Sequence, residues 1–228
     1  MAFYYFYFSI QGHGTPHEQK YCKLDLGFLV DVSKSLTRYY NDESSFIKLL
    51  TKHLPISPEE THVAVTLFNR RGYHQVKFSD HKSFKTFNLA INHLRFKGGG
   101  TSIKQGLKVA YTEMFSKENG MRQCVPKILV LITDGGQPGQ KLSAWRRTFK
   151  DANIKIIVIG VGAKRKHMLH TLVHHESHLH MASNFDEILQ PSFTNGIELC
   201  DGMQFKINAH YTIDSLAYKT QYLCKIIF

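Results

Sequence analysis

The feature that most constrains the fold of this chain is a pair of apolar runs that each end on an aspartate. One run is KLDLGFLVD at residues 23–31, and the other is KILVLITD at residues 127–134. Near-continuous apolar runs of this length are typical of strands that are buried on both faces of a parallel sheet. The two runs therefore predict buried strands that place Asp31 and Asp134 at their ends.

Helical and strand-like patterns alternate along the rest of the chain. Apolar residues recur at helical spacing in five segments: 36–53, 84–94, 103–114, 142–149 and 168–173. IKIIVIGVG at 154–162 is a further buried strand and HMAS at 180–183 a weak one, while alternation in 63–67 and 76–78 predicts a hairpin with an edge strand. We expect the helix at 84–94 to end at the glycines 98–100, and a final helix at 185–200 to be interrupted at Pro191. This order predicts a doubly wound α/β fold: a mostly parallel sheet, helices on both faces and one antiparallel edge strand.

Length and composition predict one domain with short flanking segments. The chain has 228 residues, of which 43% are apolar, enough for one substantial core. We expect an N-terminal segment at 1–21, a domain at 22–202 and a tail or linker at 203–228. No run approaches the eighteen or so apolar residues that cross a bilayer. The opening MAFYYFYFSI is apolar enough for a weak secretory signal, but it lacks a basic region before the apolar run and a clean cleavage site.

The charge balance of the chain is basic. Lysine and arginine outnumber aspartate and glutamate by 29 to 18, which gives a formal net charge of +11. Such a surface attracts polyanions such as heparin-like sugars, anionic lipid or nucleic acid. The basic residues are scattered and form no recognition arm, so a generally solvated basic surface is favoured over a polyanion site, and nucleic acid is not an expected partner.

The four cysteines are too few to build a disulfide scaffold. Cys22 precedes the first apolar run and Cys200 follows the last, so these two could join the ends of the domain. Cys124 and Cys224 have no obvious partner. No CxxC spacing occurs, which argues against a zinc ribbon or a thioredoxin-like centre.

Oxygen-bearing side chains follow both buried strands. The first strand delivers Asp31 and then Ser33 and Ser35, whose hydroxyls can point the same way if the loop is extended, and the second strand delivers Asp134. The glycines 98–100 give the backbone freedom to bring Thr101 in from a third loop. If the two strands are neighbours, two carboxylates meet at one sheet edge, and a cation between them removes their repulsion. Hydroxyls and carboxylates suit Mg²⁺ or Mn²⁺ and not Zn²⁺, and an outside carboxylate would complete the six ligands.

These residues resemble the adhesion-site motif of the von Willebrand factor type A domain. The resemblance rests on Asp31-Val-Ser33-Lys-Ser35, on Gly-Gly-Gly-Thr101 and on Thr133-Asp134-Gly135, in that order, and it covers roughly residues 22–202. It implies that Ser33, Ser35 and Thr101 ligate the metal directly, and Asp31 and Asp134 partly through water. Cys22 and Cys200 are placed as in matrilin and collagen type VI members, which implies a disulfide between them. The sequence departs from the family in the Gly-Gly-Gln-Pro-Gly run after Asp134 and at Pro191.

The function that this resemblance implies is an extracellular adhesion or matrix module, not an enzyme. A bound Mg²⁺ or Mn²⁺ would capture an Asp or Glu side chain of a protein ligand, with collagen or another matrix component as candidate ligands. The setting would be a secreted protein. No Arg-Gly-Asp sequence and no N-glycosylation acceptor sequence occurs in the chain.

Two alternatives of other classes stay open. An intracellular type A domain could act in complex assembly or bind a polyanion or nucleic acid, and the redox state of Cys22 and Cys200 would distinguish it. A Mg²⁺-dependent phosphohydrolase of the haloacid dehalogenase type also begins with a strand-end aspartate, but it needs D-x-D, and position 33 is serine.

The histidine-rich stretch near residue 175 resembles a zinc protease motif without being one. H-E-x-x-H would need histidine at position 179, which is leucine. His167, His170 and His174 lie on one helical face, and a solvated, partly basic surface is favoured there over a Zn²⁺ or Cu²⁺ site. The basic run at 164–166 could bind phosphate or sulfate, but an exposed, solvated run is favoured there.

Overall fold

The computed structural model describes residues 23–136, 141–163 and 165–199. Its six strands are β1 (Asp25–Asp31), β2 (His62–Phe68), β3 (Gly72–Val76), β4 (Lys127–Thr133), β5 (Ile154–Val161) and β6 (Leu179–Ala182). Its α-helices are α1 (Tyr40–Thr51), α2 (Phe84–Asn92), α3 (Ile103–Val109), α4 (Ser143–Asp151), α5 (Lys166–His170), α6 (Phe185–Ile188) and α7 (Pro191–Thr194). Shorter turns of other helix types are η1 (Lys34–Tyr39), η2 (Ala110–Met114), η3 (Lys117–Asn119) and η4 (Glu176–His178).

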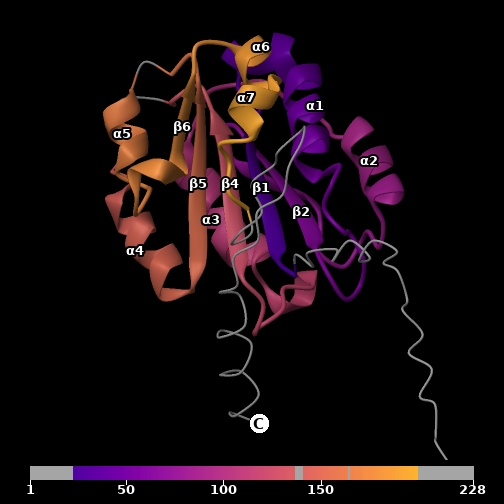
Figure 1. Cartoon of the computed structure of the whole chain (residues 1–228). Coiled ribbons are helices and arrows are strands. Elements are labelled where there is room, and N and C mark those ends of the chain that lie inside the picture. Colours follow the sequence, from indigo (N-terminus) through magenta and orange to yellow (C-terminus); the bar gives the residue numbers. More distant parts are fainter. Residues whose placement is uncertain (1–22, 137–140, 164, 200–228) are drawn as a thin grey trace, which may run out of the picture.

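The strands form one sheet in the order β3-β2-β1-β4-β5-β6 (Figure 1). Every neighbouring pair is parallel except β2 and β3, which form the antiparallel hairpin at one edge. The predicted sheet and its edge strand are confirmed. β1, β4 and β5 are completely or almost completely buried, as their apolar runs predict.

Helices cover both faces of the sheet, and each face has its own apolar core. One core joins α1, α2 and α6 to one face through residues such as Phe46, Phe87 and Phe185. The other joins α3, α4 and α5 to the opposite face through Leu107, Phe149 and others. The predicted doubly wound architecture is thus confirmed.

Two predicted helix ends differ from the structure. The expected final helix is instead two four-residue helices, α6 and α7, separated by an extended Gln190. Pro191 has no backbone N–H to continue α6, and it occupies the first position of α7, where no such donor is needed. α2 ends at Asn92 and not at the glycines, because residues 93–97 form a non-helical connection before the turn at 98–100.

The cysteine prediction stays a prediction. Cys124 is disulfide-bonded and is the only cysteine within the described ranges. The expected pair Cys22–Cys200 lies outside the described residues, as do the segments 1–21 and 203–228. No helix of the described part is long and apolar enough to span a membrane.

Candidate metal centre

The candidate site lies at the carboxyl ends of β1 and β4, the two central strands of the sheet. These strands are parallel neighbours, and Val30 at the end of β1 pairs with Ile132 near the end of β4. Asp31 is the last residue of β1, and Asp134 directly follows Thr133, the last residue of β4. The expectation that both aspartates reach one sheet edge from neighbouring strands is confirmed.

Asp31 is fixed in the interior by two hydrogen bonds. It is 0% exposed; Oδ1 accepts a bond of 3.1 Å from the Ser33 backbone N–H, and Oδ2 accepts one of 2.6 Å from the Thr133 hydroxyl. Burial raises the pKa of Asp31 to about 6, and the charge of Asp134 adds to this, while the bonds from Thr133 and Ser33 oppose it. The site therefore holds a buried carboxylate whose charge the protein alone compensates poorly.

Ser33, Ser35 and Asp134 form a chain of contacts that leads from Asp31 toward solvent. The hydroxyls of Ser33 and Ser35 are 3.2 Å apart, and Ser35 Oγ donates a hydrogen bond of 2.5 Å to Asp134 Oδ2. Ser33 is buried, Asp134 half-buried and Ser35 exposed. The structure thus brings four of the five predicted residues into one connected group that is open to solvent at one end.

Thr101 comes from the glycine loop, which is tied to the same group through the backbone. Gly98 and Gly99 have φ values of +61° and +103°, which side chains with a Cβ rarely adopt. The Lys34 N–H, between the two serines, donates to the Gly99 carbonyl at 2.8 Å. Thr101 itself is 9% exposed. The loop that carries it is therefore fastened to the loop of Ser33 and Ser35, as the sequence predicts.

Supporting residues at this edge were not singled out from the sequence. Asn69, just after β2, donates from Nδ2 to the Gly98 carbonyl at 2.5 Å and accepts from the Ser102 N–H at 2.7 Å through its own carbonyl. Arg165 Nη1 donates to the Gly136 carbonyl at 2.8 Å, which places a cation beside the loop that follows Asp134. Glu43, in the first turn of α1, is 0% exposed. Only tertiary packing reveals the roles of Asn69, Arg165 and Glu43, because each of these residue types is common at such a position in a sequence.

The side chains present fit a small, hard divalent cation. They supply carboxylate and hydroxyl oxygens, the ligands that Mg²⁺ and Mn²⁺ prefer. Within the described residues no Lys, Arg or His forms an ion pair with Asp31 or Asp134. Asp25, at the opposite end of β1, is also 0% exposed, but Arg122 Nη2 lies 2.8 Å from its Oδ1. β1 thus carries two buried aspartates. Arg122 neutralises the charge of Asp25, whereas no described Lys, Arg or His forms an ion pair with Asp31.

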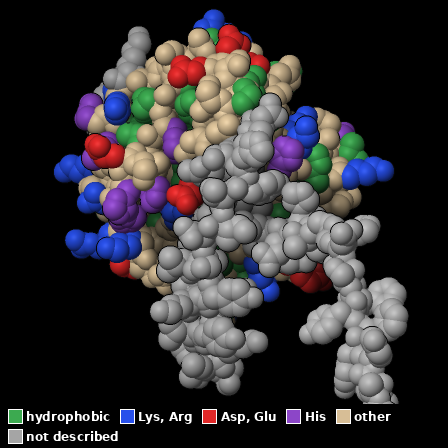
Figure 2. Space-filling model, in the orientation of Figure 1, with side chains coloured by type: hydrophobic (Ala, Val, Ile, Leu, Met, Phe, Trp, Pro, Cys, Tyr) green, Lys and Arg blue, Asp and Glu red, His purple; other side chains and the backbone are tan. Residues whose placement is uncertain are grey.

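The histidine-rich region forms a separate surface. Burial lowers the pKa of His178, and the nearby charges of Lys155, His175 and His174 lower it further. Figure 2 shows histidine and basic side chains gathered on the side of the molecule where Figure 1 places α4 and α5. No group of three or more His, Cys, Asp or Glu side chains that could hold a metal ion occurs in the part of the chain described here. The region is a polar, partly basic face.

Comparisons with known proteins identify the family of the chain. The family model described as the von Willebrand factor type A domain matches residues 25–194. The chain is 25% identical to matrilin-2 of Mus musculus over 214 residues, which covers 89% of this chain and 22% of that protein. It is 30% identical to matrilin-1 of Gallus gallus over 141 residues, or 61% of this chain and 28% of that protein. The chain thus corresponds to less than a third of the length of either relative.

Solved structures show the same fold. Proximal thread matrix protein 1 from the mussel byssus superposes with a TM-score of 0.67 at 26% identity, over 74% of this chain and 44% of that one. A further structure of that protein, described as having a zinc occupied MIDAS motif, gives a TM-score of 0.69 at 22% identity, over 74% and 46% of the two chains. The likeness at 22% identity concerns the fold alone.

Proposed function

Because the chain belongs to the von Willebrand factor type A domain family, we propose that it is an adhesion module that uses a bound divalent cation to capture an acidic side chain of a protein ligand. The observation that carries this proposal is the connected group of Asp31, Ser33, Ser35 and Asp134 at one sheet edge, with the Thr101 loop fastened to it. A bound Mg²⁺ or Mn²⁺ would supply the charge that holds the ligand carboxylate, and no covalent bond is made or broken.

The residues of the site have distinct parts in this proposal. Ser33, Ser35 and Thr101 offer neutral hydroxyl oxygens, while Asp31 and Asp134 offer negative charge. The buried hydrogen bonds of Asp31 fix its carboxylate, so the site is formed before the ligand arrives. Ser35 is exposed and Asp134 half-buried, so a ligand carboxylate reaches the group from their side. Arg165, bonded to the Gly136 carbonyl, stands where a positive charge favours an acidic partner.

We place this module in the extracellular matrix. Relatives that the chain matches, among them the matrilins, are secreted proteins of the extracellular matrix. Collagen and other matrix components that expose Asp or Glu are the candidate ligands. The identity of the metal also belongs to the proposal: the oxygen donor set favours Mg²⁺ or Mn²⁺, whereas the mussel protein has been crystallised with zinc in its motif.

The experiment that tests this function is affinity capture from a solubilised matrix extract. Immobilised wild-type protein is incubated with the extract in Mg²⁺ or in EDTA, and retained proteins are identified by mass spectrometry. Asp134→Ala is the matched variant, since Asp134 is half-buried and its loss leaves the core intact. We expect to identify proteins that wild type retains in Mg²⁺. The same proteins should not be retained by wild type in EDTA or by Asp134→Ala in Mg²⁺. A retained set that is the same in all three conditions contradicts the proposal.

A further inference from the structure

Glu43 is a buried carboxylate whose own neighbours do not explain it. It lies in the first turn of α1, on the helix face that also carries the buried Phe46, Ile47 and Leu50. The residue is 0% exposed, and neither carboxylate oxygen has a hydrogen-bond partner within the described part of the chain. Burying an ionised carboxylate without a partner is costly. A glutamate in this place is either protonated or balanced by a positive charge nearby.

Glu43 lies near the candidate metal centre. Asp31 and Asp134 raise its pKa well above the usual value, after the larger effect of burial, and both act more strongly than its sequence neighbour Asp42. Both aspartates at the strand ends therefore lie close enough to act on Glu43. α1 follows η1, which begins at Lys34 between the two serines, so the chain path also places Glu43 beside the site.

No side chain of the described residues supplies the missing positive charge. The charges of Asp31 and Asp134 act on Glu43, and that of Asp134 acts on Asp31. None of the three forms an ion pair with a described Lys, Arg or His. Two nearby carboxylates already repel by several kcal/mol at an effective dielectric near 20, and a third adds to this. A divalent cation at the strand ends would offset the repulsion of all three.

We propose that Glu43 is a third acidic group of this cation site, one that strengthens binding of the divalent ion from the buried side of Asp31. The inference rests on the proposed function, because it concerns the same cation. Glu43 acts through water and through its charge and is not a direct ligand, since the described residues contain no group of three His, Cys, Asp or Glu close enough to hold a metal. With it, the site carries three carboxylates, which favours a divalent cation over a monovalent one.

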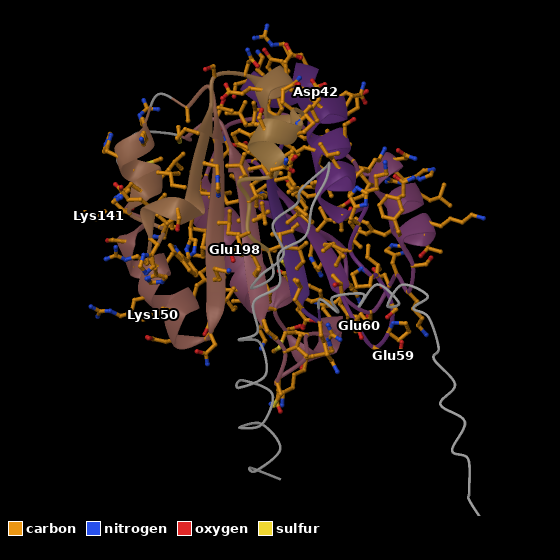
Figure 3. All side chains as sticks on the ribbon, in the orientation of Figure 1. Asp42, Glu59, Glu60, Lys141, Lys150 and Glu198 are labelled. Carbon is orange, nitrogen blue, oxygen red and sulfur yellow. The ribbon has the colours of Figure 1, made fainter. Side chains whose placement is uncertain are left out.

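The test is isothermal titration of Mg²⁺, and separately of Mn²⁺, into wild type, Glu43→Gln and Glu60→Gln at pH 7.5. Glutamine keeps the size of the side chain and removes its charge. Glu60 is the matched control: its Oε2 is also buried without a partner, but Figure 3 places it at the end of the molecule opposite Asp42, which precedes Glu43. Glu43→Leu, which also lacks the charge, is a second variant in case glutamine does not pack.

We expect Glu43→Gln and Glu43→Leu to raise the dissociation constant of Mg²⁺ at least tenfold, equal to about 1.4 kcal/mol. Glu60→Gln should stay within twofold of wild type. Both Glu43 variants should keep a metal-free melting temperature at or above that of wild type, because a neutral side chain is cheaper to bury. If wild type binds Mg²⁺ and Glu43→Gln binds it equally well, Glu43 is a neutral core residue and the inference is overturned while the proposed function stands. If wild type binds neither metal, the proposed function fails, and this inference with it.

Discussion

The Thr133 hydroxyl donates a hydrogen bond of 2.6 Å to Asp31 Oδ2 and so ties the end of β4 to the end of β1. The same oxygen, Thr133 Oγ1, accepts a bond of 3.1 Å from the Gly135 N–H and thereby shapes the loop that carries Asp134. Thr133 and Asp31 are both 0% exposed. One hydroxyl thus fixes both aspartates of the candidate site, although it is not one of the predicted ligands.

Thr133→Val tests this tie while keeping the shape of the side chain. The change leaves Asp31 Oδ2 and the Gly135 N–H without a partner in the interior, which should cost about 1–3 kcal/mol of unfolding free energy. Thr112→Val is the control, because the exposed Thr112 hydroxyl bonds only the Lys108 carbonyl of its own helix. We expect the control to stay within about 0.5 kcal/mol of wild type in urea denaturation. Equal effects of the two substitutions would show that the tie is unimportant.

The glycine loop gives a second test, based on backbone conformation alone. A Cβ added at Gly98 would come no closer than 3.8 Å to any atom, and one at Gly99 no closer than 3.5 Å, so neither substitution causes a clash. Gly98 at φ +61° lies inside the small left-handed region that other residues adopt uncommonly, whereas Gly99 at φ +103° lies outside it. Gly99→Ala should therefore lose about 1–3 kcal/mol and Gly98→Ala about 1 kcal/mol, measured by urea denaturation. The reverse order would mean that these backbone angles are not maintained in solution.

The sequence predicts the sheet and the strand ends where four of the five oxygen donors are found connected, because both depend on local pattern. That the five residues hold a metal stays a prediction. Buried parallel strands are recognisable from their apolar runs, and the ends of neighbouring strands meet at one edge. The sequence does not predict Glu43. An acidic residue in the first turn of a helix is ordinarily explained by the helix dipole and expected on the surface. Its spacing from Phe46, Ile47 and Leu50 places it on the buried face of α1, but the residue type points to the surface, and only the packed structure shows that it is 0% exposed. The division of the last helix at Pro191 was predicted, but the shortness of both halves was not.

The half-buried His180 predicts how stability responds to acid. Burial, and next the charge of His178, lowers the pKa of His180, so the unfolded chain takes up a proton at a higher pH than the folded protein does. Stability from this group is present above the unfolded pKa of about 6.5 and is lost as the pH falls toward the folded value. His180→Gln should lose less unfolding free energy between pH 7.5 and 5.5 than wild type does. His167→Gln, at an exposed position, should behave like wild type; a loss in His180→Gln as large as that of wild type would contradict the assignment.

The basic surface predicts a polyanion response that is independent of the metal. Attraction by a net charge of +11 acts over a Debye length of about 8 Å at physiological ionic strength and weakens as salt is added. In surface plasmon resonance, heparin should therefore bind Asp134→Ala at least as tightly as wild type, in EDTA as in Mg²⁺, and should dissociate in moderate salt. Loss of heparin binding in Asp134→Ala would mean that heparin binds at the candidate metal site and not at a separate basic surface.

The most direct test of the central claim is the melting temperature of the protein with and without divalent metal. Mg²⁺ or Mn²⁺ at about 100 times its dissociation constant should add roughly 2.7 kcal/mol, which corresponds to a rise of about 5–10 °C for a domain of this size, and EDTA should reverse it. Thr101→Ala should lose most of the rise, whereas Thr112→Ala, at an exposed helix position, should retain it. Identical melting curves for wild type with millimolar Mg²⁺, with millimolar Mn²⁺ and with EDTA would contradict the account.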